Sequence, residues 1–279
     1  MPWAAVIGSP VDHSLSPTLH RAAWDWLGIS QEWEYRRIDC DKEGVEELLT
    51  SLDKECRGLS VTMPCKQAVI PYLDAIDPLA QALGSVNTVI HSGGTLTGFN
   101  TDVYGIFSAI SQVRSQPIRS ALVLGSGATA ASTLAAIGNP NLTRIHVAAR
   151  RFHGPHSLLT VAMRLGLEVD QIPLSDADRV IGLATSVDAV ISTLPAGVAD
   201  SLAARLGAPE TPTPQGVLLD VIYSPLTTPL VAAWKDKGGA SAHGLDMLAA
   251  QGIQQVKLMT GRDADLDVVR SALWAKVSS

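Results

Sequence analysis

The stretch ALVLGSGATAASTLAAIG, residues 121–138, narrows the fold of this chain more than any other part of the sequence. An apolar run predicts a buried strand, a glycine-rich turn follows it, and an apolar helix begins directly after the turn. The turn has the spacing G-x-G-x-x-A at Gly125, Gly127 and Ala130. This order is typical of a βα unit in a parallel sheet that helices cover on both faces.

Strands and helices alternate through the rest of the chain. The helix predicted over residues 16–28 has an apolar stripe, with Ser16 expected as its N-cap and Gly28 at its end. A hairpin is predicted over residues 85–100, turning at Gly93 and Gly94. Further strands are expected within residues 4–8, 33–39, 58–62, 144–150, 168–174 and 188–197. Further helices are expected within residues 42–52, 77–84 and 156–166 and from Leu245 onward. The segment 216–238 is expected to form a strand, a loop and a helix. We therefore expect doubly wound α/β sheets.

Charge and composition exclude several classes of partner. The net charge is −6, and the basic residues are scattered, whereas a nucleic-acid surface needs a clustered basic face. No apolar run approaches ~20 residues, so no membrane association is expected. Cys40, Cys56 and Cys65 lack C-x-x-C spacing, so we expect neither a disulfide framework nor a metal site. Together with an N-terminus unlike a secretion signal, these features predict a cytoplasmic protein with reduced thiols.

The residues of the glycine-rich turn suit a dinucleotide. Gly125 permits the tight turn, Gly127 lets a pyrophosphate approach the backbone, and Ala130 allows the helix to pack closely on the strand. The N-terminus of the helix, at Ala128, attracts the phosphate charge. The alternative interpretation is a generic tight turn between a strand and a helix.

The residues after the next strand distinguish NADP(H) from NAD(H). NAD sites carry an acid there, about 20 residues after the glycines, for the ribose 2′-hydroxyl. The segment VAARRFHG has no acid but has Arg150 and Arg151. A guanidinium can hold a 2′-phosphate with two hydrogen bonds, so NADP(H) is favoured. Two solvated surface arginines are the alternative.

Lys66, in the segment LSVTMPCKQAVI, raises a different question. It follows an apolar strand and has no acid within four residues on either side. A solvated lysine at the start of a helix is one explanation. The other is a catalytic or substrate-binding lysine at a strand end.

Six short stretches, taken in order along the chain, resemble shikimate dehydrogenases. They are GSPVDHSLSPTLH, LSVTMPCKQAV, LGSVNTV, GFNTDVYG, DVIYSPLTTPL and GLDMLAAQG. The resemblance implies reversible, NADP-dependent reduction of 3-dehydroshikimate to shikimate in aromatic amino acid biosynthesis. It also implies a two-domain α/β fold, with a substrate-binding domain of residues 1–103 and 245–279 and a Rossmann-like NADP-binding domain of residues 104–244. We expect a monomer or a homodimer.

The resemblance also assigns roles to side chains. Lys66 matches the family's general acid/base and Asp102 its partner, while Ser14 and Ser16 match the serines that hold the substrate carboxylate. A ketone that accepts a hydride develops alkoxide charge, which an adjacent ammonium can stabilise and protonate. Further substrate contacts are implied for Thr62, Asn87, Tyr223 and Gln251, and further cofactor contacts for Ser192, Thr193, Gly244 and Met247.

Local patterns alone would give these side chains ordinary structural roles. Ser16 and Asp102 suit helix caps, Gln251 suits the polar face of a helix, and Tyr223 suits a core aromatic. The departures from the family lie in the nucleotide segments: GSGAT replaces Gly-Ala-Gly-Gly-Ala, AARRF replaces Asn-Arg-Thr, and LPAG replaces Asn-Ala-Thr.

Three other functions fit a related scaffold. A quinate dehydrogenase, or an enzyme acting on both quinate and shikimate, tends to carry an altered serine motif and an acid after the second strand. A non-catalytic NADPH-sensing regulator should lack the lysine or the aspartate, and a tetrahydrofolate-pathway dehydrogenase should lack the Ser-x-Ser motif. This chain has none of these changes.

Overall fold

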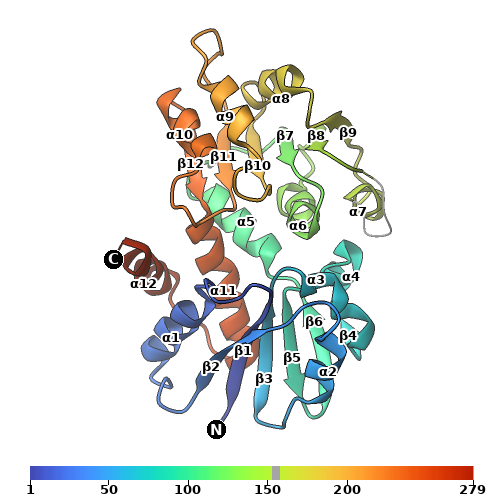
Figure 1. Cartoon of the computed structure of the whole chain (residues 1–279), viewed down its shortest axis with the longest axis vertical. Coiled ribbons are helices and arrows are strands. Elements are labelled where there is room, and N and C mark those ends of the chain that lie inside the picture. The colour runs from blue at the N-terminus through green and yellow to red at the C-terminus, as the bar shows by residue number, and fades with distance from the viewer. Residues whose placement is uncertain (153–157, 279) are drawn as a thin grey trace. The chain divides into compact units, whose positions relative to one another are not determined.

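The computed structural model describes residues 1–152 and 158–278 (Figure 1). The chain divides into two compact units, which we call the first unit (1–105 with 248–279) and the second unit (106–247). Each unit is built on its own six-stranded sheet. In the part of the chain described, no helix is long and apolar enough to cross a membrane.

The sheet of the first unit has the strand order β2-β1-β3-β5-β6-β4. β1 (Trp3–Gly8) lies parallel to both β2 (Glu34–Asp39) and β3 (Cys56–Val61). β5 (Thr88–Ser92) runs antiparallel to β3 and to β6 (Thr95–Phe99), and the short β4 (Ala75–Ile76) lies parallel to β6. The sheet is therefore mixed, because a two-residue turn reverses the chain between β5 and β6.

The predicted hairpin is confirmed. Gly93 and Gly94 have φ of +60° and +79°, the left-handed conformation that a tight hairpin turn requires at both positions. Of the two caps predicted for α1 (Ser16–Leu27), the one at its end is confirmed and the one at its start is wrong. Gly28 ends its helix in the left-handed conformation, as predicted, but Leu15 occupies the N-cap and Ser16 is the first helical residue. The reason is local: the Ser16 N–H donates to Ser14 Oγ at 3.3 Å, so the preceding serine fills the capping role.

The helices of the first unit cover both faces of its sheet (Figure 1). β1 is buried along its whole length, and its side chains share an apolar core with β3, β5 and the helices around them. Helix α1 packs against α12. The helices are α1 (Ser16–Leu27), α2 (Val45–Thr50), α3 (Cys65–Ala68), the 3₁₀ turn η1 (Ile70–Tyr72), α4 (Pro78–Leu83), the first residues of α5 (Asp102–Ser111), most of α11 (Gly244–Thr260) and α12 (Leu266–Ser278).

The sheet of the second unit is wholly parallel, with the order β12-β11-β10-β7-β8-β9. If the strands are numbered from β7 as 1 and the sheet is read from β9 to β12, the order is 3-2-1-4-5-6. This is the doubly wound dinucleotide-binding arrangement. The strands are β7 (Ser120–Leu124), β8 (Arg144–Ala149), β9 (Asp170–Pro173), β10 (Ala189–Ser192), β11 (Val217–Asp220) and β12 (Ala240–His243).

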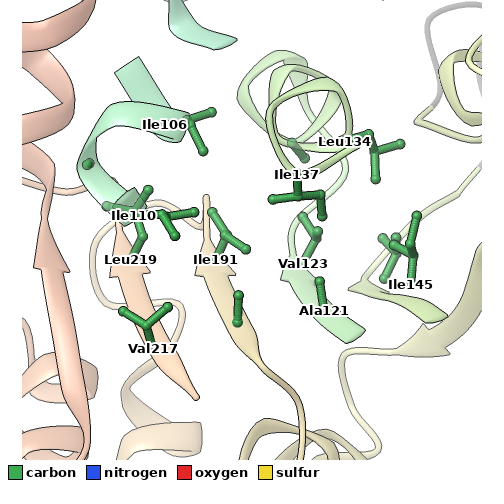
Figure 2. Packing of buried hydrophobic residues seen from close by; sticks show 14 of the residues in the cluster. Ile106, Ile110, Ala121, Val123, Leu134, Ile137, Ile145, Ile191, Val217 and Leu219 are labelled. Atoms are coloured by element: carbon green, nitrogen blue, oxygen red, sulfur yellow. The ribbon is translucent and has the colours of Figure 1, made fainter. Parts of the chain in front are cut away.

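Alternate residues of β7 are buried in two separate apolar cores. Ala121 and Val123 face the core that contains α6 and α5, shown in Figure 2, whereas Leu122 and Leu124 face the core on the other side of the sheet. Helices thus cover both faces, as the sequence predicts for a doubly wound sheet. They are α6 (Ala128–Ile137), α7 (Leu158–Arg164), α8 (Ala177–Ala184), α9 (Asp200–Leu206), α10 (Pro229–Asp236) and the rest of α5. The first two positions of the helix predicted over 156–166 lie outside the described residues.

Candidate active site

The topology of the first unit brings several loops to one edge of its sheet. β1 and β3 are parallel, so the segments that follow them, with Ser14 and with Thr62, leave from the same edge. β5 runs in the opposite direction, so Asn87, just before it, lies at that edge too. β6 ends there, two residues before Thr101. Side chains that are distant along the chain are therefore gathered in one place.

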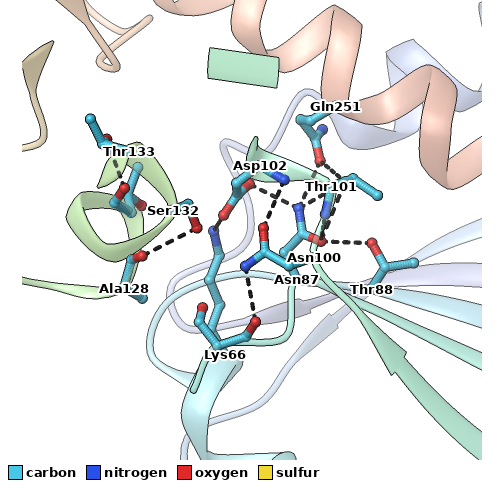
Figure 3. Close-up of polar contacts among 12 residues, drawn as sticks. Lys66, Asn87, Thr88, Asn100, Thr101, Asp102, Ala128, Ser132, Thr133 and Gln251 are labelled. Carbon is cyan, nitrogen blue, oxygen red and sulfur yellow. Dashed lines mark hydrogen bonds and ion pairs between the residues drawn. The ribbon is translucent and has the colours of Figure 1, made fainter. Parts of the chain in front are cut away.

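Lys66 and Asp102 form an ion pair at this edge. Lys66 Nζ lies 2.5 Å from Asp102 Oδ2. Figure 3 shows the two side chains in contact. The side chains are only 16% and 5% exposed. A lysine so far removed from water costs several kcal/mol unless an acid compensates its charge. The acid that the local sequence lacks is thus supplied from the start of α5, and Lys66 is not a solvated lysine.

Asn87 holds the other oxygen of the carboxylate. Its Nδ2 donates to Asp102 Oδ1 at 2.8 Å and to Thr101 Oγ1 at 2.9 Å. Its Oδ1 accepts the backbone N–H of Thr101 at 2.8 Å. The Asp102 backbone N–H in turn donates to Asn100 Oδ1 at 3.1 Å. Both carboxylate oxygens of Asp102 are therefore held by donors.

Gln251 reaches the same cluster from α11. Its Oε1 accepts from Asn87 Nδ2 and from Thr101 Oγ1, each at 3.2 Å. The structure thus joins four of the predicted site residues, Lys66, Asn87, Asp102 and Gln251, in one hydrogen-bonded cluster. Thr101 belongs to this cluster too and was not predicted; its position directly before Asp102 in FNTD was the available signal.

Ser14 and Thr62 lie on the loops after β1 and β3, and Ser16 is the first residue of α1. Ser16 is 8% exposed, and the guanidinium of Arg37 donates to the Ser14 carbonyl at 3.0 Å. The Thr62 methyl packs on Gly8, where an added Cβ would lie 2.4 Å from it. Hydroxyls beside the start of a helix are suited to bind a carboxylate. Arg37 was not predicted, and it brings a positive charge to this part of the site.

Two histidines, His20 and His243, have structural partners. His20 is wholly buried, and burial lowers its pKa to about 4, so it is neutral at pH 7. Its ring stacks on Tyr35, with 4.1 Å between centroids. His243 Nδ1 accepts the Leu245 N–H, and its Nε2 donates to the Leu226 carbonyl.

The second unit has a cavity of about 700 Å³ where its glycine-rich turn meets the loop after β10. β7 and β10 are neighbours whose chains continue to opposite faces of the sheet, the position at which doubly wound folds bind nucleotides. The cavity is lined by Gly125, Ser126, Gly127, Ala149, Arg150, Arg151, Leu174, Thr193, Leu194 and Pro195.

Glycine is required at the first position of the turn. Gly125 has φ of +112°, and a Cβ there would lie 2.4 Å from Thr193 Oγ1. Nothing lies within 4 Å of the corresponding position on Gly127, so its backbone is open to approach. Arg150 and Arg151 are exposed and line the cavity. The open glycine backbone and these two positive charges suit the pyrophosphate and the 2′-phosphate of NADP(H).

The remaining predicted cofactor and substrate residues of the second unit have other surroundings. Ala128 begins α6, while Ser192 is buried at the end of β10, and neither is part of the cavity lining. Gly244 begins α11, and Met247 is buried in the core shown in Figure 2. Tyr223 follows β11 and is half-buried.

Comparisons with known proteins place the chain in one enzyme family. Residues 6–89 match the shikimate dehydrogenase substrate binding domain, and residues 244–273 match the shikimate 5'-dehydrogenase C-terminal domain. The chain is 33% identical over 277 residues to shikimate dehydrogenase (NADP(+)) of Staphylococcus aureus, covering 96% of each chain.

Solved structures show the same similarity. Mycobacterium tuberculosis shikimate dehydrogenase superposes with a TM-score of 0.87 at 34% identity, over 99% of this chain and 100% of that one. The Thermus thermophilus enzyme in complex with NADP(H) and shikimate gives 0.81 at 31% identity, over 99% of both chains. Quinate dehydrogenase from Corynebacterium glutamicum in complex with NAD gives 0.80 at 25% identity, over 98% of this chain and 99% of that one.

The doubly wound sheet of the second unit and the buried lysine–aspartate pair of the first unit define an oxidoreductase of the nicotinamide-dependent class. The chain belongs to the shikimate dehydrogenase family.

Proposed function

We propose that this chain reduces 3-dehydroshikimate to shikimate, reversibly and with NADP(H), as a step in aromatic amino acid biosynthesis. The observation that carries the proposal is the Lys66–Asp102 ion pair, 2.5 Å long, at the sheet edge of the first unit. The relatives named for NADP(+) and the structure solved with NADP(H) and shikimate support the same substrate and cofactor.

In this proposal six side chains of the first unit each have a chemical task. NADPH, when bound, supplies the hydride. The ammonium of Lys66 donates a proton to the oxygen of the ring ketone as that oxygen gains negative charge. Asp102 orients the ammonium, and Asn87 and Gln251 orient the ring hydroxyls. Ser14 and Ser16 hold the substrate carboxylate by neutral hydrogen bonds.

The proposed division of labour follows the two units. Residues 1–105 and 248–279 bind substrate and residues 106–247 bind NADP(H). We further propose a cytoplasmic monomer or homodimer.

A quinate-specific or dual enzyme is the second candidate, because a quinate dehydrogenase is among the structural relatives. The absence of an acid in the described residues directly after β8, where Arg150 and Arg151 stand, favours NADP(H) and the first proposal. The test is the absorbance of the reduced cofactor, NADPH or NADH, with shikimate and quinate, each against NADP⁺ and NAD⁺. We expect the fastest turnover with shikimate and NADP⁺; faster turnover with quinate would replace the first proposal by the second.

Replacing Arg150 by alanine is expected to raise KM for NADP⁺ roughly 10- to 100-fold, with little change for NAD⁺. The variant loses charge-assisted hydrogen bonds to the 2′-phosphate, each worth about 1.5–3 kcal/mol. Steady-state kinetics with both cofactors measures the split. Arg144, at the opposite end of β8, is the matched control and should leave both values unchanged on replacement by alanine. An equal rise for both cofactors would show that Arg150 does not read the phosphate.

Replacing Ser14 by alanine is expected to raise KM for shikimate about tenfold while kcat changes little. The variant loses one hydrogen bond to a charged carboxylate, and also the acceptor of the Ser16 N–H. Kinetics at saturating NADP⁺ gives the result. Ser51, an exposed serine at the end of α2, is the control. An unchanged KM would place the carboxylate elsewhere.

A further inference from the structure

A buried line of polar side chains leads across the first unit to Asp102. It begins at Tyr35 on β2 and passes through Ser60 on β3, Gln255 on α11 and Thr88 on β5 before it reaches Asn87. Ser60, Thr88, Asn87 and Gln255 are each between 0% and 4% exposed. Only Asn87 has a task in the chemistry proposed above, so the burial of the others needs its own explanation.

Successive hydrogen bonds along this line run in one direction. Tyr35 donates to Ser60 Oγ at 2.7 Å, and Ser60 donates to Gln255 Oε1 at 2.7 Å. Gln255 Nε2 donates to Thr88 Oγ1 at 3.0 Å, and Thr88 donates to Asn87 Oδ1 at 2.8 Å. Asn87 Nδ2 then donates to Asp102 Oδ1 at 2.8 Å. Figure 3 shows the last part of the line, from Thr88 to Asp102.

Two backbone groups force this direction. Gln255 Nε2 also lies 3.0 Å from the Asn87 carbonyl, which only accepts, so the nitrogen of the Gln255 amide must face β5. The Thr88 hydroxyl, which accepts from that nitrogen, has its own hydrogen left for Asn87 Oδ1. The Thr101 backbone N–H, which only donates, points at the same Oδ1 at 2.8 Å.

The orientation of Asn87 follows from these donors. A reversed carboxamide would set its oxygen against the Asp102 carboxylate and its nitrogen against the Thr101 N–H. Such contacts are costly in a buried site of low dielectric constant. With Asn87 held as observed, Asp102 Oδ1 is occupied by an N–H and Oδ2 is left for the Lys66 ammonium at 2.5 Å.

We propose that Gln255 and Thr88 are positioning residues for the reaction. They lock the Asn87 carboxamide, and through it they fix the orientation of the Asp102 carboxylate beside the lysine that transfers the proton. This inference rests on the proposed function and extends it to two residues beyond the substrate site.

The test compares Thr88→Val, Thr88→Ser, Gln255→Met and the double variant Thr88→Val/Gln255→Met. Turnover of shikimate with NADP⁺ is divided by the number of NADPH-binding sites from fluorescence titration, which counts folded protein. We expect Thr88→Val to lower kcat about tenfold, because a buried acceptor and donor lose their partner. Thr88→Ser, which keeps the hydroxyl, should stay within about twofold of the wild type.

The double variant tests whether the two residues act in one line. Gln255→Met should lower kcat by less than Thr88→Val, because the Thr88 hydroxyl can still reach Asn87. The double variant should match Thr88→Val alone, since effects transmitted through a shared group are not additive. Thr185→Val is the control: it removes a buried hydroxyl that donates to the Ile181 carbonyl in the second unit, and it should leave kcat unchanged.

Three results would overturn the inference: wild-type kcat in Thr88→Val, an equal loss in Thr88→Ser, or losses that multiply in the double variant. These are distinct from failure of the proposed function. If the wild type turns over neither shikimate nor quinate, the proposed function fails and this inference falls with it.

Discussion

Replacing Lys66 by alanine is expected to lower kcat by roughly 10²–10⁴ while the affinity for NADPH stays the same. The ammonium is the proton donor proposed for the ketone oxygen, and it lies 2.5 Å from Asp102 in a position that is only 16% exposed. Without it, the developing alkoxide has neither a cation nor a proton beside it. Rates of 3-dehydroshikimate reduction at saturating substrate, with NADPH affinity from fluorescence titration, measure the effect.

Two further lysine variants separate charge from proton transfer. Lys66→Arg keeps a positive charge, but a guanidinium does not release a proton near neutral pH, so it should recover little of the lost rate. Lys54→Ala removes an exposed lysine of the same unit and should be indistinguishable from the wild type. A Lys66→Ala enzyme within twofold of the wild-type kcat would remove this residue from the mechanism.

Replacing Asp102 by asparagine is expected to lower kcat roughly 10²- to 10³-fold. The substitution keeps the shape of the side chain, and Asn87 Nδ2 would still require an oxygen opposite it, at the present Oδ1 position. The new amide nitrogen would then face the Lys66 ammonium, donor against donor. Breaking one partner of a buried ion pair in this way costs about 3–5 kcal/mol, and the lysine would turn away or lose its proton.

The same kinetic assay, with thermal unfolding measured in parallel, checks this second prediction. Asp25→Asn changes an exposed aspartate on α1 and is the control for loss of one negative charge. A full loss of activity together with a loss of NADPH binding would indicate a misfolded protein. Wild-type kcat in folded Asp102→Asn would contradict the assignment of Asp102 as the partner of Lys66.

Short stretches of the sequence specify several local features of this protein. The strand, glycine turn and helix of residues 121–138, the Gly93–Gly94 hairpin and the Asp77 cap of α4 are all observed. Each depends on backbone conformation and side chains a few residues apart, so a local pattern specifies it. The six family stretches likewise predict that Lys66 and Asp102 form a pair, and the ion pair is observed.

Other features depend on contacts that no local pattern contains. β12 has only four residues, Ala240–His243, with little apolar alternation, and it becomes a strand because β11 offers an open edge. Lys66 and Asp102 are 36 residues apart, and Ser60 and Gln255 are 195 apart. Their hydrogen bonds exist because the strand order of the first unit brings those segments to one edge of a sheet and α11 returns from the end of the chain to cover it. The sequence thus predicts which groups carry the chemistry, whereas the tertiary packing decided which atoms of those groups face one another, since hydrogen bonds require distances that only the folded chain sets.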